Sequence, residues 1–101
     1  MDTKIEYTAI AKRWFDKING NTYHSVRVIR NPDGKTIYQP FTYGYGDSYR
    51  QSALEVMLKE GWLPKEYTDK NKYMFERENN YPIYWDCSDG LKRDCVANGK
   101  D

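Results

Sequence analysis

The residues with the most chemical potential in this sequence are one histidine and two cysteines. His24 is the only histidine among 101 residues. Nucleophilic catalysis of the Ser/His/Asp or Cys/His type needs a histidine beside an activated nucleophile, and no G-x-S-x-G, P-loop or H-E-x-x-H motif accompanies this one. We therefore interpret His24 as a hydrogen-bonded structural residue and expect no catalytic residues and no enzymatic activity.

The cysteines do not have the spacing of a metal site. Structural zinc sites usually place paired cysteines two to four residues apart, whereas Cys87 and Cys95 follow a C-x7-C pattern. In a hairpin that turns at Asp89-Gly90, the two thiols lie on opposite faces, which argues against a disulfide or a shared ion. The nearby aspartates do not follow the spacing of a calcium-binding loop; they are Asp86, Asp89 and Asp94. We expect free thiols, no metal and no cofactor.

A loop with two glycines ahead of a helix is a candidate ligand site. Residues 43–50 read Tyr-Gly-Tyr-Gly-Asp-Ser-Tyr-Arg. Backbone N–H groups at a helix N-terminus bind phosphate, and tyrosines beside an arginine suit a base with its phosphate. Asp47 at the cap would repel an anion, and a plain strand-to-helix connection is the alternative reading. The candidate ligand- or phosphate-binding residues are Tyr43, Tyr45, Gly46, Tyr49 and Arg50.

Three strands joined by tight turns are predicted ahead of this loop. Asn19-Gly20 favours a two-residue hairpin turn, and residues 31–34, Asn-Pro-Asp-Gly, favour a four-residue turn. Pro40 cannot donate to a sheet ladder, so the third strand is predicted to be an edge strand. The predicted strands are 7–18, 22–30 and 35–43.

The most clearly patterned element is a helix at 48–60. Its apolar residues form one broad face, Gly61 suits the C′ position, and Pro64 blocks continuation. A polar loop at 65–72 follows, and then a β-rich tail at 73–101. The strands predicted in this tail are 73–77, 81–87 and 91–96.

These elements predict an α+β fold. We expect a three-stranded antiparallel sheet packed by one α-helix in the order βββα, followed by a β-rich C-terminal hairpin region. At this length a single domain over 1–101 is expected, in which 1–64 form the βββα unit.

The two-residue turn also assigns each strand residue to one face of the sheet, because it pairs Phe15 with His24. The face under the helix then carries the core residues Ala9, Ala11, Phe15, Val26, Val28, Ile37 and Phe41. The opposite face mixes aromatic and basic side chains and, if open, suits stacking on bases or packing on a protein. Cover by the C-terminal strands or by a second protomer is the alternative. The candidate macromolecule-binding residues are Lys12, Trp14, Tyr23, Arg27 and Tyr38.

The composition is close to neutral and rich in tyrosine. The net charge is +1, and there are 10 Tyr, 3 Trp and 3 Phe. Neutrality gives no support to nucleic-acid binding from charge alone. Tyrosine is enriched at recognition surfaces, and it also suits half-buried strands. No apolar run is long enough to span a bilayer and the first residues lack a signal-peptide pattern, so we expect a cytoplasmic protein without a membrane partner.

Four stretches of the sequence resemble a family of short proteins encoded by bacteriophages and prophages. These stretches read WFDKINGNTYHSVR (14–27), PFTYGYGD (40–47), GWLP (61–64) and SDGLKRDC (88–95), and the resemblance extends over most of the chain. The resemblance implies a context and assigns no site residues: small phage proteins often bind and block host machinery, including CRISPR and other defence systems. The compartment would then be the host bacterial cytosol.

The βββα order is similar to that of the plant ethylene-response-factor DNA-binding domain and of the amino-terminal domain of phage-type integrases. Those domains lay a three-stranded sheet into the major groove. This similarity is at the level of fold alone and implies nucleic-acid binding only by analogy.

Three functions follow as hypotheses. The first is a small non-enzymatic binding protein that binds and inhibits a host protein or protein complex, for example a CRISPR or other anti-phage defence component. The second is a nucleic-acid-binding module that uses the aromatic and basic sheet face. The third is a nucleotide-sequestering protein that uses the Gly44–Arg50 loop. An oligomer is compatible with each of them.

Overall fold

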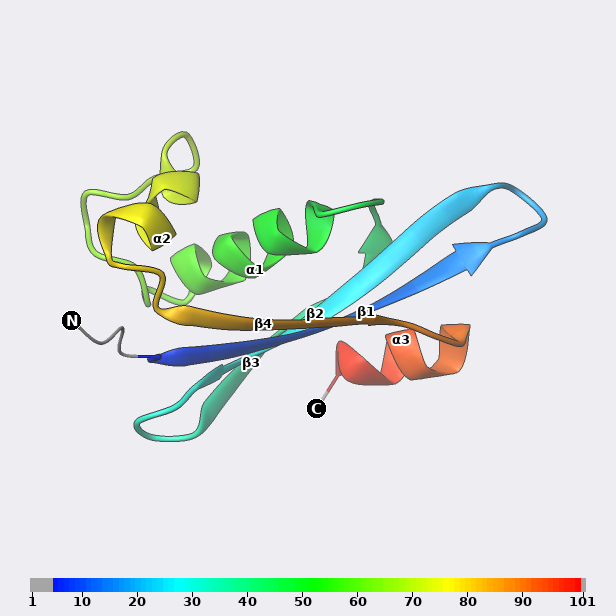
Figure 1. Cartoon of the computed structure of the whole chain (residues 1–101), viewed down its shortest axis with the longest axis horizontal. Helices are drawn as coiled ribbons and strands as arrows, with labels where there is room; N and C mark the ends of the chain where they lie inside the picture. Colours follow the sequence, from blue (N-terminus) through cyan, green and yellow to red (C-terminus); the bar gives the residue numbers. More distant parts are fainter. Residues whose placement is uncertain (1–4, 101) are drawn as a thin grey trace.

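The computed structural model describes residues 5–100 and has an α+β fold built on one four-stranded mixed sheet (Figure 1). The strand order is β3-β2-β1-β4, with α1 on one face and α3 on the other. The strands are β1 (Tyr7–Asp16), β2 (Asn21–Arg30), β3 (Lys35–Tyr43) and β4 (Ile83–Asp89). The helices are α1 (Ser48–Lys59), the 3-10 turn η1 (Lys72–Met74), α2 (Phe75–Glu78) and α3 (Lys92–Asn98).

The hairpin between β1 and β2 turns over four residues, so the predicted two-residue turn is wrong. Asp16 pairs with Asn21 across the turn. The Asp16 carboxylate accepts the N–H groups of Ile18 at 3.0 Å and Asn19 at 3.3 Å. Within the turn only Gly20, with φ of 70°, takes the left-handed conformation. The aspartate side chain thus stabilises a turn in which Asn19 does not need positive φ.

This change moves the register of the hairpin by two residues. Phe15 pairs with Thr22, and Arg13 pairs with His24. Because side chains alternate between faces with a period of two, an even shift leaves each β1 and β2 residue on its predicted face. The face assignment therefore survives although the pairing was wrong.

A bulge in β3 does change one face assignment. Val26 pairs with Gln39 but His24 pairs with Thr42, so Pro40 and Phe41 together face Ser25. Proline cannot continue the ladder, and a bulge there costs little. The bulge moves Phe41 from the predicted core face to the opposite face of the sheet.

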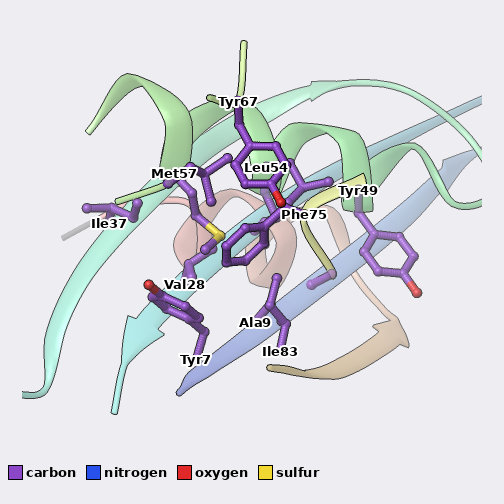
Figure 2. Close-up of a cluster of buried hydrophobic side chains, with 14 residues drawn as sticks. Tyr7, Ala9, Val28, Ile37, Tyr49, Leu54, Met57, Tyr67, Phe75 and Ile83 are labelled. Carbon is purple, nitrogen blue, oxygen red and sulfur yellow. The ribbon is translucent and has the colours of Figure 1, made fainter. Parts of the chain in front are cut away.

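The core lies between the sheet and α1, where small and branched strand residues meet one apolar helix face (Figure 2). Tyr7, Phe75 and Ile83 extend this core toward the end of the molecule that carries α2. The fully or nearly fully buried residues of the central layer are Ala9, Ala11, Val26, Val28, Ile37, Ala53, Leu54 and Met57. Phe15, predicted in the core, is 53% exposed instead. It lies beyond Arg13, the last β1 residue that β4 pairs with.

The C-terminal third differs most from the prediction. Residues predicted as a strand at 73–77 form η1 and α2. The strand predicted at 81–87 is present as β4, and it pairs parallel to β1 at the edge of the main sheet. The segment predicted as a strand at 91–96 is the helix α3. The predicted β-rich hairpin tail is therefore one strand and one helix that complete the main fold.

The loop predicted at 65–72 contains a buried anchor. Tyr67 is 6% exposed, packs edge-on to Phe75, and donates from its hydroxyl to Glu78 at 2.6 Å. Hydrogen bonding to that carboxylate is the main reason that the pKa of Tyr67 is raised.

Within residues 5–100, no helix combines the length and apolar character needed to cross a membrane.

Candidate binding surface

Helix α3 covers the middle of the sheet face that was predicted to be open or covered by strands. The Ser25 hydroxyl donates to the carbonyl of Cys95, and the Asn98 amide donates to the carbonyl of Ile10 at 2.9 Å. A Cβ on Gly99 would lie 2.8 Å from the Gln39 carbonyl oxygen. Only glycine lets the end of α3 approach β3 this closely.

This helix separates the five predicted macromolecule-binding residues into two groups. Trp14 and Tyr23 stack at 5.8 Å near the start of the helix, where Lys92 contacts Trp14. Near its end, where Arg27 donates to the Lys100 carbonyl, the Arg27 guanidinium lies 5.2 Å from the Tyr38 ring centroid. Lys12 lies in register between the groups, and its ammonium donates to Ser88 at 2.9 Å. The predicted single surface is thus two smaller ones.

The first group belongs to a larger aromatic cluster. Phe41, moved to this face by the bulge, packs edge-on to Tyr23 at 4.9 Å and to Trp14 at 6.2 Å. Tyr43 packs against Tyr23 at 5.8 Å. The Lys92 ammonium lies 5.4 Å from the Trp14 ring centroid, a cation–π contact. We call Trp14, Tyr23 and Phe41 the aromatic cluster.

Several segments meet at the end of the molecule where the β1–β2 hairpin projects (Figure 1), and they carry exposed apolar side chains. They come from the hairpin, from the β3–α1 loop and from the β4–α3 turn. Each is between 53% and 93% exposed. The five residues are Phe15, Ile18, Tyr43, Tyr45 and Leu91, and we call them the tip surface.

Arg13 ties together the three segments that carry the tip surface. Its Nε donates to Asp89 at 2.8 Å, and its Nη1 donates to the Gly46 carbonyl at 3.1 Å. The hydrogen bond to Asp89 is the largest cause of the raised pKa of Arg13. Asp89 ends β4 and Gly46 precedes α1, so one side chain holds both segments against β1. Next to this clasp, Phe15 and Leu91 line an open pocket of about 410 Å³.

The predicted ligand loop does not assemble a single site. Tyr43 packs against Tyr23 on the α3 side of the sheet. Tyr49 is buried and packs edge-on to Trp85, and Arg50 lies 5.0 Å from the same indole. Gly46 has φ of 60°, and its carbonyl is used by Arg13. Tyr45 is 66% exposed in the loop between β3 and α1, so the five candidates serve different parts of the fold.

His24 has the surroundings of a structural residue. It is 2% exposed, and its ring nitrogens lie 3.1 Å from the Gly44 carbonyl and 2.7 Å from the Ser52 hydroxyl. Because a carbonyl only accepts, Nδ1 donates to Gly44, and Nε2 forms the second hydrogen bond with the Ser52 hydroxyl. A Cβ on Gly44 would lie 2.5 Å from the imidazole. Both ring nitrogens are thus used to fix the start of the β3–α1 loop.

Both cysteines are free thiols, as predicted, and they lie in different layers. Cys87 pairs in register with Ala11 and packs against the core. Cys95 is fully buried on the side of α3 that faces the sheet, where its thiol donates to the Lys12 carbonyl at 3.3 Å. Burial raises the pKa of both thiols. Among residues 5–100 no cluster of three metal-ligating side chains is present.

Sequence reasoning missed most of the tip surface. Phe15 was assigned to the core, and Ile18 and Leu91 were read as parts of turns or strands. The available signal was an apolar residue inside a turn, since Ile18 lies between Lys17 and Asn19.

Comparison with protein-family models, with curated proteins and with solved structures gives no match to this chain.

Proposed function

We propose that this protein is a small non-enzymatic binding protein that engages a partner protein through the tip surface. The observation that carries the proposal is the concentration of exposed apolar and aromatic side chains at the projecting end of the sheet. Large exposed apolar side chains concentrated at one end of a small domain are typical of an interaction site. Tyrosine is among the residues that most often dominate the binding energy of protein interfaces.

The fold supports this use because the surface rests on rigid supports. The Arg13 clasp fixes the loop before α1 and the end of β4, and the Asp16 carboxylate fixes the hairpin turn. A pre-organised surface loses little conformational entropy on binding. The partner therefore gains most of the free energy of burying Tyr45 and Leu91.

The resemblance to phage and prophage proteins supports a host protein as the partner. Under this proposal the protein acts in the cytosol of the host bacterium, and binding blocks a host factor such as a CRISPR or other anti-phage defence component. Blocking by contact needs no catalytic group, which fits the structural role of the His24 hydrogen bonds.

The test is affinity capture from bacterial lysate with the tagged protein and two double variants. Tyr45→Ser/Leu91→Ser removes two tip residues. Tyr73→Ser/Tyr84→Ser is the matched control, because Tyr73 and Tyr84 are 62% and 58% exposed but lie with η1 and at the start of β4, toward the other end. Both variants should change the free energy of unfolding by less than about 1 kcal/mol, since only exposed side chains are altered.

We expect a protein captured by the wild type and by the control variant to be lost from the Tyr45→Ser/Leu91→Ser sample. Truncating two anchor residues should weaken binding by a factor of roughly 30 or more. Capture of the same proteins by all three samples would contradict the proposal.

A further inference from the structure

We propose that the surface around α3 binds single-stranded nucleic acid, with the phosphates on a group of unpaired cations and bases on the aromatic cluster. This site shares no residue with the tip surface, so it can be tested independently of the proposed protein partner. The cations are Arg27, Lys92, Arg93 and Lys100.

The first observation is that these four cations make no salt bridge among residues 5–100. By contrast, Arg13, Arg30 and Lys72 are each paired with a carboxylate. Lys92, Arg93 and Lys100 are also exposed. Unpaired cations that lie close together repel one another, and an anionic ligand relieves that repulsion.

The second observation is a shallow groove on the outer side of α3. Its volume is about 660 Å³, and it is lined by Lys92, Arg93, Val96, Ala97 and Lys100. Val96 and Ala97 form an apolar floor between three cations. Asp94, the acidic residue of α3, is not part of this lining. The groove therefore presents positive charge beside apolar surface.

The third observation concerns Arg27. Its Nη2 donates to the Lys100 carbonyl at 3.3 Å, which brings it to the end of the same groove. Its Nε is buried and is the only such side-chain nitrogen or oxygen within residues 5–100 that lacks a hydrogen-bond partner, so it is closed to a surface ligand. Arg27 as a whole is only partly buried. A guanidinium has five N–H donors, so the two Nη groups of Arg27 keep capacity for an anion.

Lys92 connects the groove to the aromatic cluster. Its ammonium lies 5.4 Å from the Trp14 ring centroid and 5.9 Å from that of Phe41. The positive charge of Lys92 also contributes to the lowered pKa of Asp16, after the larger contributions from the turn hydrogen bonds. A strand whose phosphates follow Lys100, Arg93 and Lys92 would bring its next base to Trp14, where the base would replace the Lys92 ammonium on the ring as Lys92 turns to a phosphate.

These features favour a single strand over other polyanions. Aromatic faces next to cations are how proteins bind unpaired bases without sequence preference, since every base has a face that stacks. A duplex offers no free base faces, and α3 stands on the sheet and prevents the sheet from lying in a major groove. An acidic protein would use the cations and leave the aromatic cluster unused.

The test is fluorescence anisotropy with labelled oligo(dT), oligo(U) and a DNA duplex, at low and at physiological salt. Poly-glutamate serves as a competitor that carries negative charge, like a nucleic acid, but has no bases. Arg93→Glu/Lys100→Glu removes two proposed phosphate contacts. Lys65→Glu/Lys70→Glu is the matched control, with the same change of charge at exposed positions of the loop after α1. Circular dichroism checks that each variant is folded.

We expect binding of the single strands that weakens with salt, and weaker binding of the duplex. Arg93→Glu/Lys100→Glu should reduce the slope of the logarithm of the binding constant against the logarithm of the salt concentration by about 0.7 for each lost contact. The control variant should leave this slope unchanged. Trp14→Leu should weaken binding roughly fivefold to a hundredfold through lost stacking. Absence of binding at low salt, equal effects of the two charge variants, or poly-glutamate competing as well as oligo(dT) would each overturn the proposal.

Discussion

The two faces of the sheet are covered by helices in different ways. On one face, α1 packs apolar side chains against the sheet, and Met57 belongs to one buried cluster with Ala9 and Val28 (Figure 2). On the other face, α3 is seven residues long and is held through Ser25 and Asn98 by hydrogen bonds. Apolar burial scales with area, whereas each hydrogen bond contributes only about 1 kcal/mol net.

This difference indicates a division between the two faces, one for stability and one for binding. The α1 face supplies most of the stability of the fold. The α3 face leaves aromatic and charged side chains at its flanks, where both proposed binding surfaces begin. Substitutions on the two faces should therefore differ in their effects on stability.

The largest effect is expected at the centre of the α1 face. Met57 has no exposed surface. Met57→Ala should lower the free energy of unfolding by about 2–5 kcal/mol, because it removes buried apolar groups and leaves a cavity. Urea denaturation followed by tryptophan fluorescence measures the change. Val96→Ala on α3 is the comparison and should cost less than about 1 kcal/mol, since Val96 is only half-buried. Equal losses would break the proposed division.

The second effect concerns the close approach of α3 to the sheet. A Cβ on Gly99 would meet backbone atoms of Gln39 and Pro40 at 2.8 Å and 2.9 Å. Gly99→Ala should therefore cost about 1–3 kcal/mol and loosen α3. Gly90→Ala is the control, because a Cβ there meets nothing closer than 4.0 Å. Hydrogen exchange should show faster exchange in α3 for Gly99→Ala alone; unchanged α3 protection would argue against this close packing.

The third and smallest effect is the pH dependence of the α3 contact. Burial raises the pKa of Cys95, so folding favours the neutral thiol. Its contribution to stability is fully present below the unfolded-state pKa of about 8.5 and is lost as the pH rises through the higher folded-state pKa. Ionisation would also remove the thiol's hydrogen bond to Lys12.

Alkylation monitored by mass spectrometry measures this effect. Cys95 should react slowly at neutral pH and faster as the pH rises, and Gly99→Ala should accelerate the reaction. Cys87, in the other layer, provides the internal reference because its reactivity should not respond to Gly99→Ala. Rapid labelling of wild-type Cys95 at neutral pH would contradict its burial on the side of α3 that faces the sheet.

The sequence predicted the elements before residue 61 well, and it predicted those of the C-terminal third poorly. The strands around residues 31–34 and the helix before Gly61 follow from local turn chemistry and from one apolar face, so both are present in the structure. The face assignments of β1 and β2 survived a wrong turn because the error was two residues. These features depend on neighbours in the sequence.

The features that were missed depend on distant contacts. Nothing near Pro40 in the sequence shows that a bulge will move Phe41 to the other face. Helix α3 turns Cys95 and Asn98 toward the sheet, and this mixed pair gives no apolar period. The place of β4 beside β1 is a parallel pairing that needs the whole α1–α2 crossover. The candidate site was missed for the same reason, because the tip surface is assembled from three separate turns.

The most direct test of the central claim is photo-crosslinking at the tip surface in bacterial cells. A photoreactive phenylalanine analogue replaces Tyr45 in one sample and Tyr73 in the other, because both tyrosines are strongly exposed but belong to opposite ends of the fold. We predict that irradiation yields a discrete adduct with a second protein from position 45 and not from position 73. Identical adducts from both positions, or an adduct from position 73 alone, would contradict a binding surface at the tip.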